Sequence, residues 1–72
     1  MEYFDEKSNF EFKWMDDHLV RCWHSTGSSI DLRITIANNR LEVRSDNGNI
    51  TRENHEKLYS AVERAYQTWG LI

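Results

Sequence analysis

Residue types that bind zinc alternate along one short segment of this 72-residue chain. His18, Cys22 and His24 would share one face of a β-strand, because alternate side chains of a strand point the same way. Along a strand these residues lie about 6.8 or 13.6 Å apart, so the three cannot all reach one ion without a bend. We therefore expect no metal site, and we interpret Cys22 as a small core residue.

Catalytic chemistry has no better support in the sequence. A cysteine nucleophile needs exposure and a lowered pKa, and a mid-strand position beneath a helix provides neither. The adjacent carboxylates Asp16 and Asp17 have the composition of an ordinary turn. The sequence contains no phosphate-binding loop, dinucleotide-binding fingerprint or hydrolase nucleophile elbow. We therefore expect no catalytic residues and no cofactor, and we predict that the protein is not an enzyme.

A third set of residues, arginines with a tryptophan, has the chemistry of a binding surface. Arg21, Trp23, Arg33 and Arg44 fall on the polar side of three segments that have the composition of β-strands, and Leu19 shares that side. Exposed tryptophan beside arginine is typical of the residues that contribute most to protein–protein binding. We therefore predict that these five residues bind a partner, unless the N-terminal segment folds over the two apolar ones.

Several segments supply the sheet that these side chains need. Residues 10–14 alternate aromatic with charged side chains, and residues 18–24 are rich in β-forming types. Residues 30–36 alternate isoleucine or leucine with polar side chains. An asparagine pair at 38–39 leads into a similar alternation at 41–45, and asparagine tolerates the left-handed backbone of a two-residue hairpin turn. The sequence therefore predicts consecutive antiparallel strands.

The last segment carries the signals of a helix over residues 51–69. Thr51 can cap the first turn, and Gly70 can end the helix in the left-handed conformation. Apolar side chains recur there at three- and four-residue spacing and form one stripe. The stripe comprises Leu58, Ala61, Val62, Ala65, Tyr66 and Trp69. Elsewhere, residues 25–28 predict a loop, and residues 1–9 predict a short strand or an ordered arm.

These elements predict an α+β fold in a single domain over residues 1–72. Residues 10–46 would form a three- to four-stranded antiparallel β-meander, because short connections favour pairing between consecutive strands. One C-terminal α-helix, residues 51–69, would be packed on one face of that sheet. A single helix covers a single face, so the other face, which carries the arginines and Trp23, stays open.

The strand register suggested by the loop lengths aligns Glu11, Arg21, Arg33 and Arg44 in one row across the open face. Like charges directly opposite one another are mildly destabilising, so the row needs an explanation. One explanation is diagonal ion pairing. Those pairs would be Arg33 with Glu42, Arg44 with Asp31, and Arg21 with Glu11. The other explanation is a contact surface for an acidic protein, a carboxylate or a phosphate backbone.

The charge, the cysteine count and the apolar runs of the sequence further restrict the classes of function that we expect. The chain has nine lysines and arginines against twelve aspartates and glutamates, and this net charge of −3 disfavours tight binding to a phosphate backbone. A single cysteine favours a reducing compartment. No apolar run is long enough to span a membrane and no cationic leader is present, so we expect a cytoplasmic protein.

We therefore predict a small non-enzymatic module that acts through protein–protein contacts on its open sheet face, with a partner that the sequence does not identify. A homodimeric structural subunit that buries the same face is one alternative. A nucleic-acid-binding domain is another, because three antiparallel strands followed by a helix resemble the topology of integrase-type DNA-binding domains and the later part of double-stranded-RNA-binding domains. The sequence carries no motif of either family.

Overall fold

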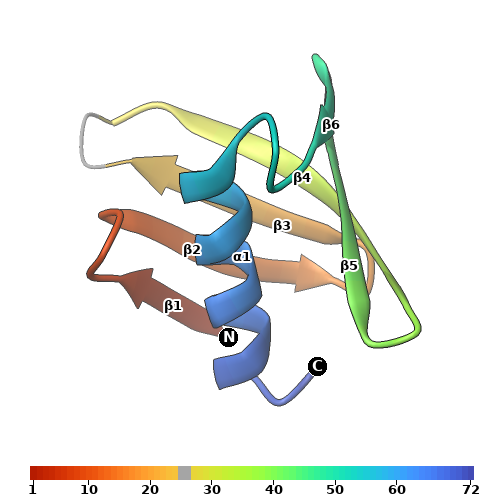
Figure 1. Cartoon of the computed structure of the whole chain (residues 1–72). Helices are drawn as coiled ribbons and strands as arrows, with labels where there is room; N and C mark the ends of the chain where they lie inside the picture. Colours follow the sequence, from red (N-terminus) through yellow and green to blue (C-terminus); the bar gives the residue numbers. More distant parts are fainter. Residues whose placement is uncertain (25–26) are drawn as a thin grey trace.

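A computed structural model describes residues 1–24 and 27–72 of the chain. Its elements are the strands β1 (Glu2–Asp5), β2 (Phe10–Asp16), β3 (Leu19–His24), β4 (Ser29–Ala37), β5 (Arg40–Ser45) and β6 (Gly48–Ile50), followed by the helix α1 (Glu56–Thr68). Each strand pairs antiparallel with the next in one six-stranded sheet of order β1-β2-β3-β4-β5-β6 (Figure 1). The predicted α+β class with an antiparallel sheet and a C-terminal helix is confirmed, whereas the predicted count of three to four strands is too low.

The two edge strands account for the difference. β1 forms from the segment predicted as a strand or an arm, and it pairs with β2 so that Tyr3 faces Phe12. β6 follows a two-residue turn and pairs Ile50 with Val43. The prediction ended the sheet at residue 46, because a strand of three residues is too short to show an alternating pattern.

The hairpin between β4 and β5 forms as predicted. Asn38 and Asn39 have φ angles of 54° and 60°, and a type I′ turn requires two such left-handed residues. The turn joins Ala37 directly to its partner Arg40. Local turn chemistry therefore sets the register between β4 and β5.

The two preceding hairpins differ from the predicted register by two residues. Arg21 faces Lys13 and Asp31 rather than Glu11 and Arg33. A β-bulge near the end of β2 and the two-residue turn after it set the register between β2 and β3. Of the predicted loop at 25–28, residues 25 and 26 lie outside the described residues. Because the shift is even, every side chain of these strands keeps its predicted face.

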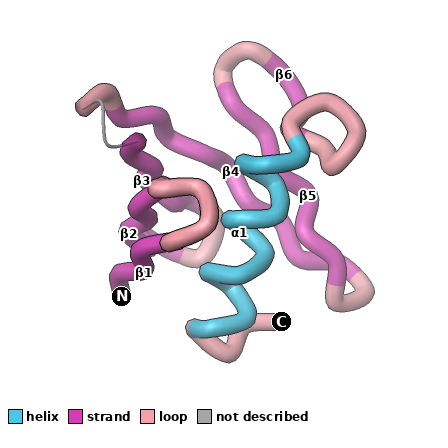
Figure 2. Tube along the Cα trace, turned by 60° about the vertical axis from the view of Figure 1, so that its left-hand side comes forward, coloured by secondary structure: helices cyan, strands magenta, loops and turns pink. Residues whose placement is uncertain are grey.

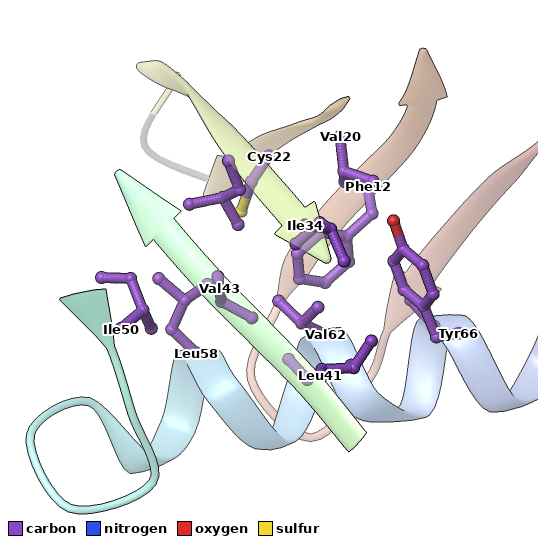
Figure 3. Packing of buried hydrophobic residues seen from close by; sticks show 13 residues of the cluster. Phe12, Val20, Cys22, Ile34, Leu41, Val43, Ile50, Leu58, Val62 and Tyr66 are labelled. Atoms are coloured by element: carbon purple, nitrogen blue, oxygen red, sulfur yellow. The ribbon is translucent and has the colours of Figure 1, made fainter. Parts of the chain in front are cut away.

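The sheet curves around α1, which lies with β1, β2 and β3 on one side and β5 and β6 on the other (Figures 1 and 2). Buried side chains of the sheet meet the apolar stripe of the helix on this face (Figure 3). The core comprises Phe12, Val20, Cys22, Leu32, Ile34, Leu41, Val43, Ile50, Leu58, Ala61, Val62, Ala65 and Tyr66. Trp69, the last member of the predicted stripe, packs half-buried against it.

The helix begins at Glu56, later than predicted. Thr51 does not cap it: the Thr51 hydroxyl accepts a hydrogen bond from the Asn54 backbone N–H at 3.1 Å, and the Asn54 side chain accepts one from the Thr51 N–H at 2.7 Å. These two bonds close a separate turn between β6 and the helix. Gly70, with a φ of 75°, follows the helix as predicted. Among the described residues, no helix combines the length and the apolar character needed to cross a membrane.

Candidate functional site

The five residues predicted to bind a partner lie together on the sheet face opposite the helix, and we call them the open-face residues. Leu19 faces Arg33 and Arg33 faces Arg44, so these three form one row across β3, β4 and β5. Arg21 and Trp23 occupy the next alternate positions of β3 and share that face. From standard strand spacings, the five positions fit within about 17 Å.

Arg21 is neutralised, although not by the predicted partner. Its guanidinium donates to Asp31, directly opposite on β4, with Nε–Oδ1 and Nη2–Oδ2 distances of 2.8 and 3.3 Å. These hydrogen bonds raise the pKa of Arg21 and lower the pKa of Asp31. Among the described residues, the predicted diagonal pairs of Arg21 with Glu11, Arg33 with Glu42 and Arg44 with Asp31 are absent. The two-residue shift in register brings Asp31 directly opposite Arg21, which accounts for the absence of the pairs of Arg21 with Glu11 and of Arg44 with Asp31. It does not account for Arg33 and Glu42, because the register between β4 and β5 is as predicted.

Among the open-face residues, Arg33 and Arg44 are the two cations without an ion pair to any carboxylate that the structure describes. They face each other across β4 and β5 with both side chains exposed. Neither forms an ion pair with any residue that the structure describes. Their other neighbours in the row, Leu19 and Asn49, are uncharged. Opposed like charges destabilise a sheet, so this pair costs the fold some stability while remaining available to an anionic group.

Leu19 and Trp23 provide apolar surface beside the arginines, and both are half-buried. The alternative in which the N-terminal segment covers them is not realised, since β1 instead extends the sheet at the outer edge of β2. Phe4 of β1 adds a side chain that is 52% exposed on the same face, separated from Trp23 by Glu11 in one row. Three separate apolar side chains, those of Phe4, Leu19 and Trp23, therefore lie on the same face as Arg33 and Arg44.

The zinc-ligand residue types do not converge. Within residues 1–24 and 27–72, no three histidine, cysteine or acidic side chains are placed to hold a metal ion. The Nδ1 of His18 lies 3.4 Å from the Ile34 carbonyl oxygen, and the His24 ring packs edge-on against Phe10 at 5.0 Å between centroids. Cys22 is buried, and burial raises the pKa of its thiol to about 12. A thiol that stays protonated at neutral pH is a poor nucleophile.

A groove beside β5 was missed from the sequence. It has a volume of about 650 Å³ and is lined by residues 39–44, by residues 49–53 and by two side chains of α1. Tyr59 reaches from the helix to β5, where its hydroxyl donates to the Leu41 carbonyl oxygen at 2.8 Å. The Arg52 guanidinium stacks 5.1 Å from the centre of the Tyr59 ring. The signal in the sequence is Tyr59 itself, an aromatic side chain just outside the predicted apolar stripe.

A buried ion pair between β1 and α1 was also missed. Asp5 is 1% exposed, and its carboxylate accepts hydrogen bonds from the Nε and Nη2 of Arg64 at 2.6 and 2.8 Å. Tyr3 and Ser8 donate to the same carboxylate. The hydrogen bonds from Arg64 hold the pKa of Asp5 well below its usual range, although burial opposes the shift. These contacts occupy the carboxylate within the protein, so the cluster links two elements and offers no binding site.

Comparison with known proteins identifies no relative. A scan against protein-family models, a search of curated proteins and a search of solved structures each find no match to this chain. The open-face residues and the groove are therefore the basis on which a function is assigned.

Proposed function

We propose that this chain is a small non-enzymatic protein-binding module that acts through its open sheet face. Its partner is a protein surface that presents carboxylates to Arg33 and Arg44 and packs an apolar side chain against Leu19 and Trp23. Guanidinium groups bind carboxylates through charge-assisted and often bidentate hydrogen bonds, which give geometric specificity as well as affinity. Aromatic and arginine side chains together are the usual centres of such interfaces.

The observation that carries the proposal is the direct opposition of Arg33 and Arg44 without a carboxylate partner among the described residues. A pair that lowers stability and forms no ion pair with the described residues is typical of a functional surface, where activity and stability compete. Arg21 supports the interpretation in a different way. Its hydrogen bonds to Asp31 hold the guanidinium in place, and Arg21 occupies the position on β3 between Leu19 and Trp23.

A protein surface suits this face better than a nucleic acid. Carboxylates are interspersed with the cations on the same face, at Glu2, Glu11, Asp31 and Glu42. A phosphate backbone would meet these carboxylates as well as the arginines, and the net charge of −3 adds a longer-range repulsion. A protein partner can instead place opposite charges at each position.

The test is a capture experiment with matched variants. The immobilised chain is incubated with a cell lysate, and bound polypeptides are identified for the wild type, Arg33→Glu, Trp23→Ala and Lys57→Glu. Arg33→Glu converts two opposed cations into an opposite-charge pair, so we expect the fold to persist, which circular dichroism checks. Lys57→Glu makes the same change of charge at an exposed position of α1 and is the matched control.

The proposal requires a polypeptide that the wild type and Lys57→Glu bind and that both open-face variants lose. Binding that survives Arg33→Glu and Trp23→Ala would refute it. If nuclease treatment abolishes the capture, the nucleic-acid-binding alternative replaces the proposal. A doubling of mass with concentration in sedimentation equilibrium, abolished by Trp23→Ala, would replace it with the homodimer.

A further inference from the structure

The free half of β5 has backbone without a strand neighbour on one side. β5 spans Arg40–Ser45, but β6 pairs only with its last three residues, from Val43 to Ser45. Among the described strands, residues 40–42 pair with β4 alone. The groove of about 650 Å³ is lined by residues 39–44 and therefore extends along this unpaired half.

Backbone hydrogen-bonding groups of β5 point into this groove. The Leu41 carbonyl does so, because it accepts the hydrogen bond from the Tyr59 hydroxyl at 2.8 Å. In an antiparallel strand the N–H and C=O of one residue point to the same side, so the Leu41 N–H faces the groove as well. The Tyr59 hydroxyl thus occupies the carbonyl that an added strand would use. Covering an edge with a helix or loop is one way in which native sheets prevent unwanted pairing, so an added strand has to displace this hydroxyl.

The exposed side chains of this half-strand carry an alternating charge. Arg40 and Glu42 share one face and are exposed, and neither forms an ion pair with a residue that the structure describes. Opposite charges directly across two strands attract, and like charges repel. A strand that continues the direction of β6 runs antiparallel to β5 and meets Glu42 before Arg40. Its complementary order is therefore a basic residue followed, two positions later, by an acidic one.

We propose that residues 40–42 of β5 are a strand-addition site for an extended peptide segment whose basic and acidic residues face Glu42 and Arg40. The peptide pairs with the Leu41 N–H and C=O and displaces the Tyr59 hydroxyl from the carbonyl. Main-chain hydrogen bonds supply affinity in this mode of recognition, and alternate side chains supply specificity. Arg44, one of the open-face residues, also lines the groove, but the proposed peptide contacts are made by residues 40–42, so either proposal can be tested without the other.

The test uses two synthetic hexapeptides of identical composition. The first is acetyl-Thr-Lys-Val-Glu-Val-Thr-amide, and the second, acetyl-Thr-Glu-Val-Lys-Val-Thr-amide, exchanges the two charges. Each is titrated into the ¹⁵N-labelled chain while the amide signals of residues 39–42 are followed by NMR. We expect the Lys-first peptide to bind at least about threefold more tightly, because two cross-strand contacts change from attractive to repulsive in the other.

Two protein variants sharpen the test. The double variant Arg40→Glu/Glu42→Arg is expected to reverse the preference between the peptides, since it exchanges the same charges on β5. Tyr59→Phe is expected to tighten the binding of the Lys-first peptide, because it frees the Leu41 carbonyl. Dispersed amide spectra establish that each variant is folded. The proposal is overturned if both peptides bind equally, or if millimolar peptide leaves the residue 39–42 amides unchanged in both the wild type and Tyr59→Phe.

Discussion

Replacing Arg64 with methionine would leave the Asp5 carboxylate as a buried charge without its cation. Asp5 is 1% exposed, and Arg64 supplies two of its hydrogen bonds, at 2.6 and 2.8 Å. The Arg64 side chain is itself only 31% exposed, so solvent screens this pair less than a surface pair. Methionine keeps most of the aliphatic packing, and the loss therefore reports mainly on the charge.

The size of the effect follows from the contacts that remain. Removing one partner of a buried ion pair costs about 3–5 kcal/mol when the other charge is left unpaired. Here Tyr3 and Ser8 still donate to Asp5, so we expect a loss of about 2–3 kcal/mol in the free energy of unfolding at pH 7. Domains of this length have roughly 4–10 kcal/mol of stability in total. The midpoint of thermal unfolding should therefore fall by roughly 10–20 °C.

Urea unfolding followed by tryptophan fluorescence measures this loss, and its pH dependence tests the cause. In the wild type the pKa of Asp5 is lowered in the folded state, so its stabilisation is present above the unfolded pKa near 4 and is lost as the pH falls below it. In Arg64→Met the main cause of the lowering is removed while burial still raises the pKa. The difference in stability between wild type and variant should therefore shrink as the pH falls from 7 to 3.

Lys57→Met is the control, because it removes a cation from an exposed position of the same helix. We expect it to change stability by less than about 0.5 kcal/mol. The interpretation of Asp5 and Arg64 as a stabilising pair is refuted if Arg64→Met costs no more than this control. It is also refuted if the difference from the wild type grows in acid.

Three further predictions concern single side chains. Burial raises the pKa of Cys22 to about 12, so its thiol should not react with a thiol reagent in the native protein but should react fully in urea. Stoichiometric labelling of the native protein would contradict the burial of Cys22. Tyr66 is 1% exposed and its hydroxyl has no hydrogen-bond partner among the described residues, so Tyr66→Phe should raise the free energy of unfolding by about 1 kcal/mol. A measured loss would instead mean that this hydroxyl is hydrogen-bonded. Asn38→Ala should lower the free energy of unfolding by about 1 kcal/mol, because residue 38 has a left-handed φ of 54° that alanine disfavours. An unchanged urea midpoint would argue against the type I′ turn.

Which face each side chain occupies could be predicted from the sequence even though two of the registers were wrong. Arg21 lies two residues from its predicted neighbours on both sides, yet it remains on the open face with Trp23, Arg33 and Arg44. The reason is the two-residue period of a strand, which any even shift preserves. An even shift does, however, change which residues lie opposite one another on neighbouring strands. The predicted row of arginines therefore kept Arg33 opposite Arg44 but lost Arg21, which pairs with Asp31.

The amino-acid sequence by itself determined the features that depend on neighbouring residues: the alternation of each longer strand, the asparagine turn at 38–39, and the end of the helix at Gly70. Only the tertiary structure decided the contacts between distant segments. Asp5 and Arg64 are 59 positions apart, and Tyr59 meets a carbonyl of β5 that is 18 positions away. Such contacts depend on how strongly the sheet curves around the helix and on where short edge strands begin and end. The periodicity of a single segment predicts neither the curvature of the sheet nor the ends of its edge strands, because both result from packing the segments together.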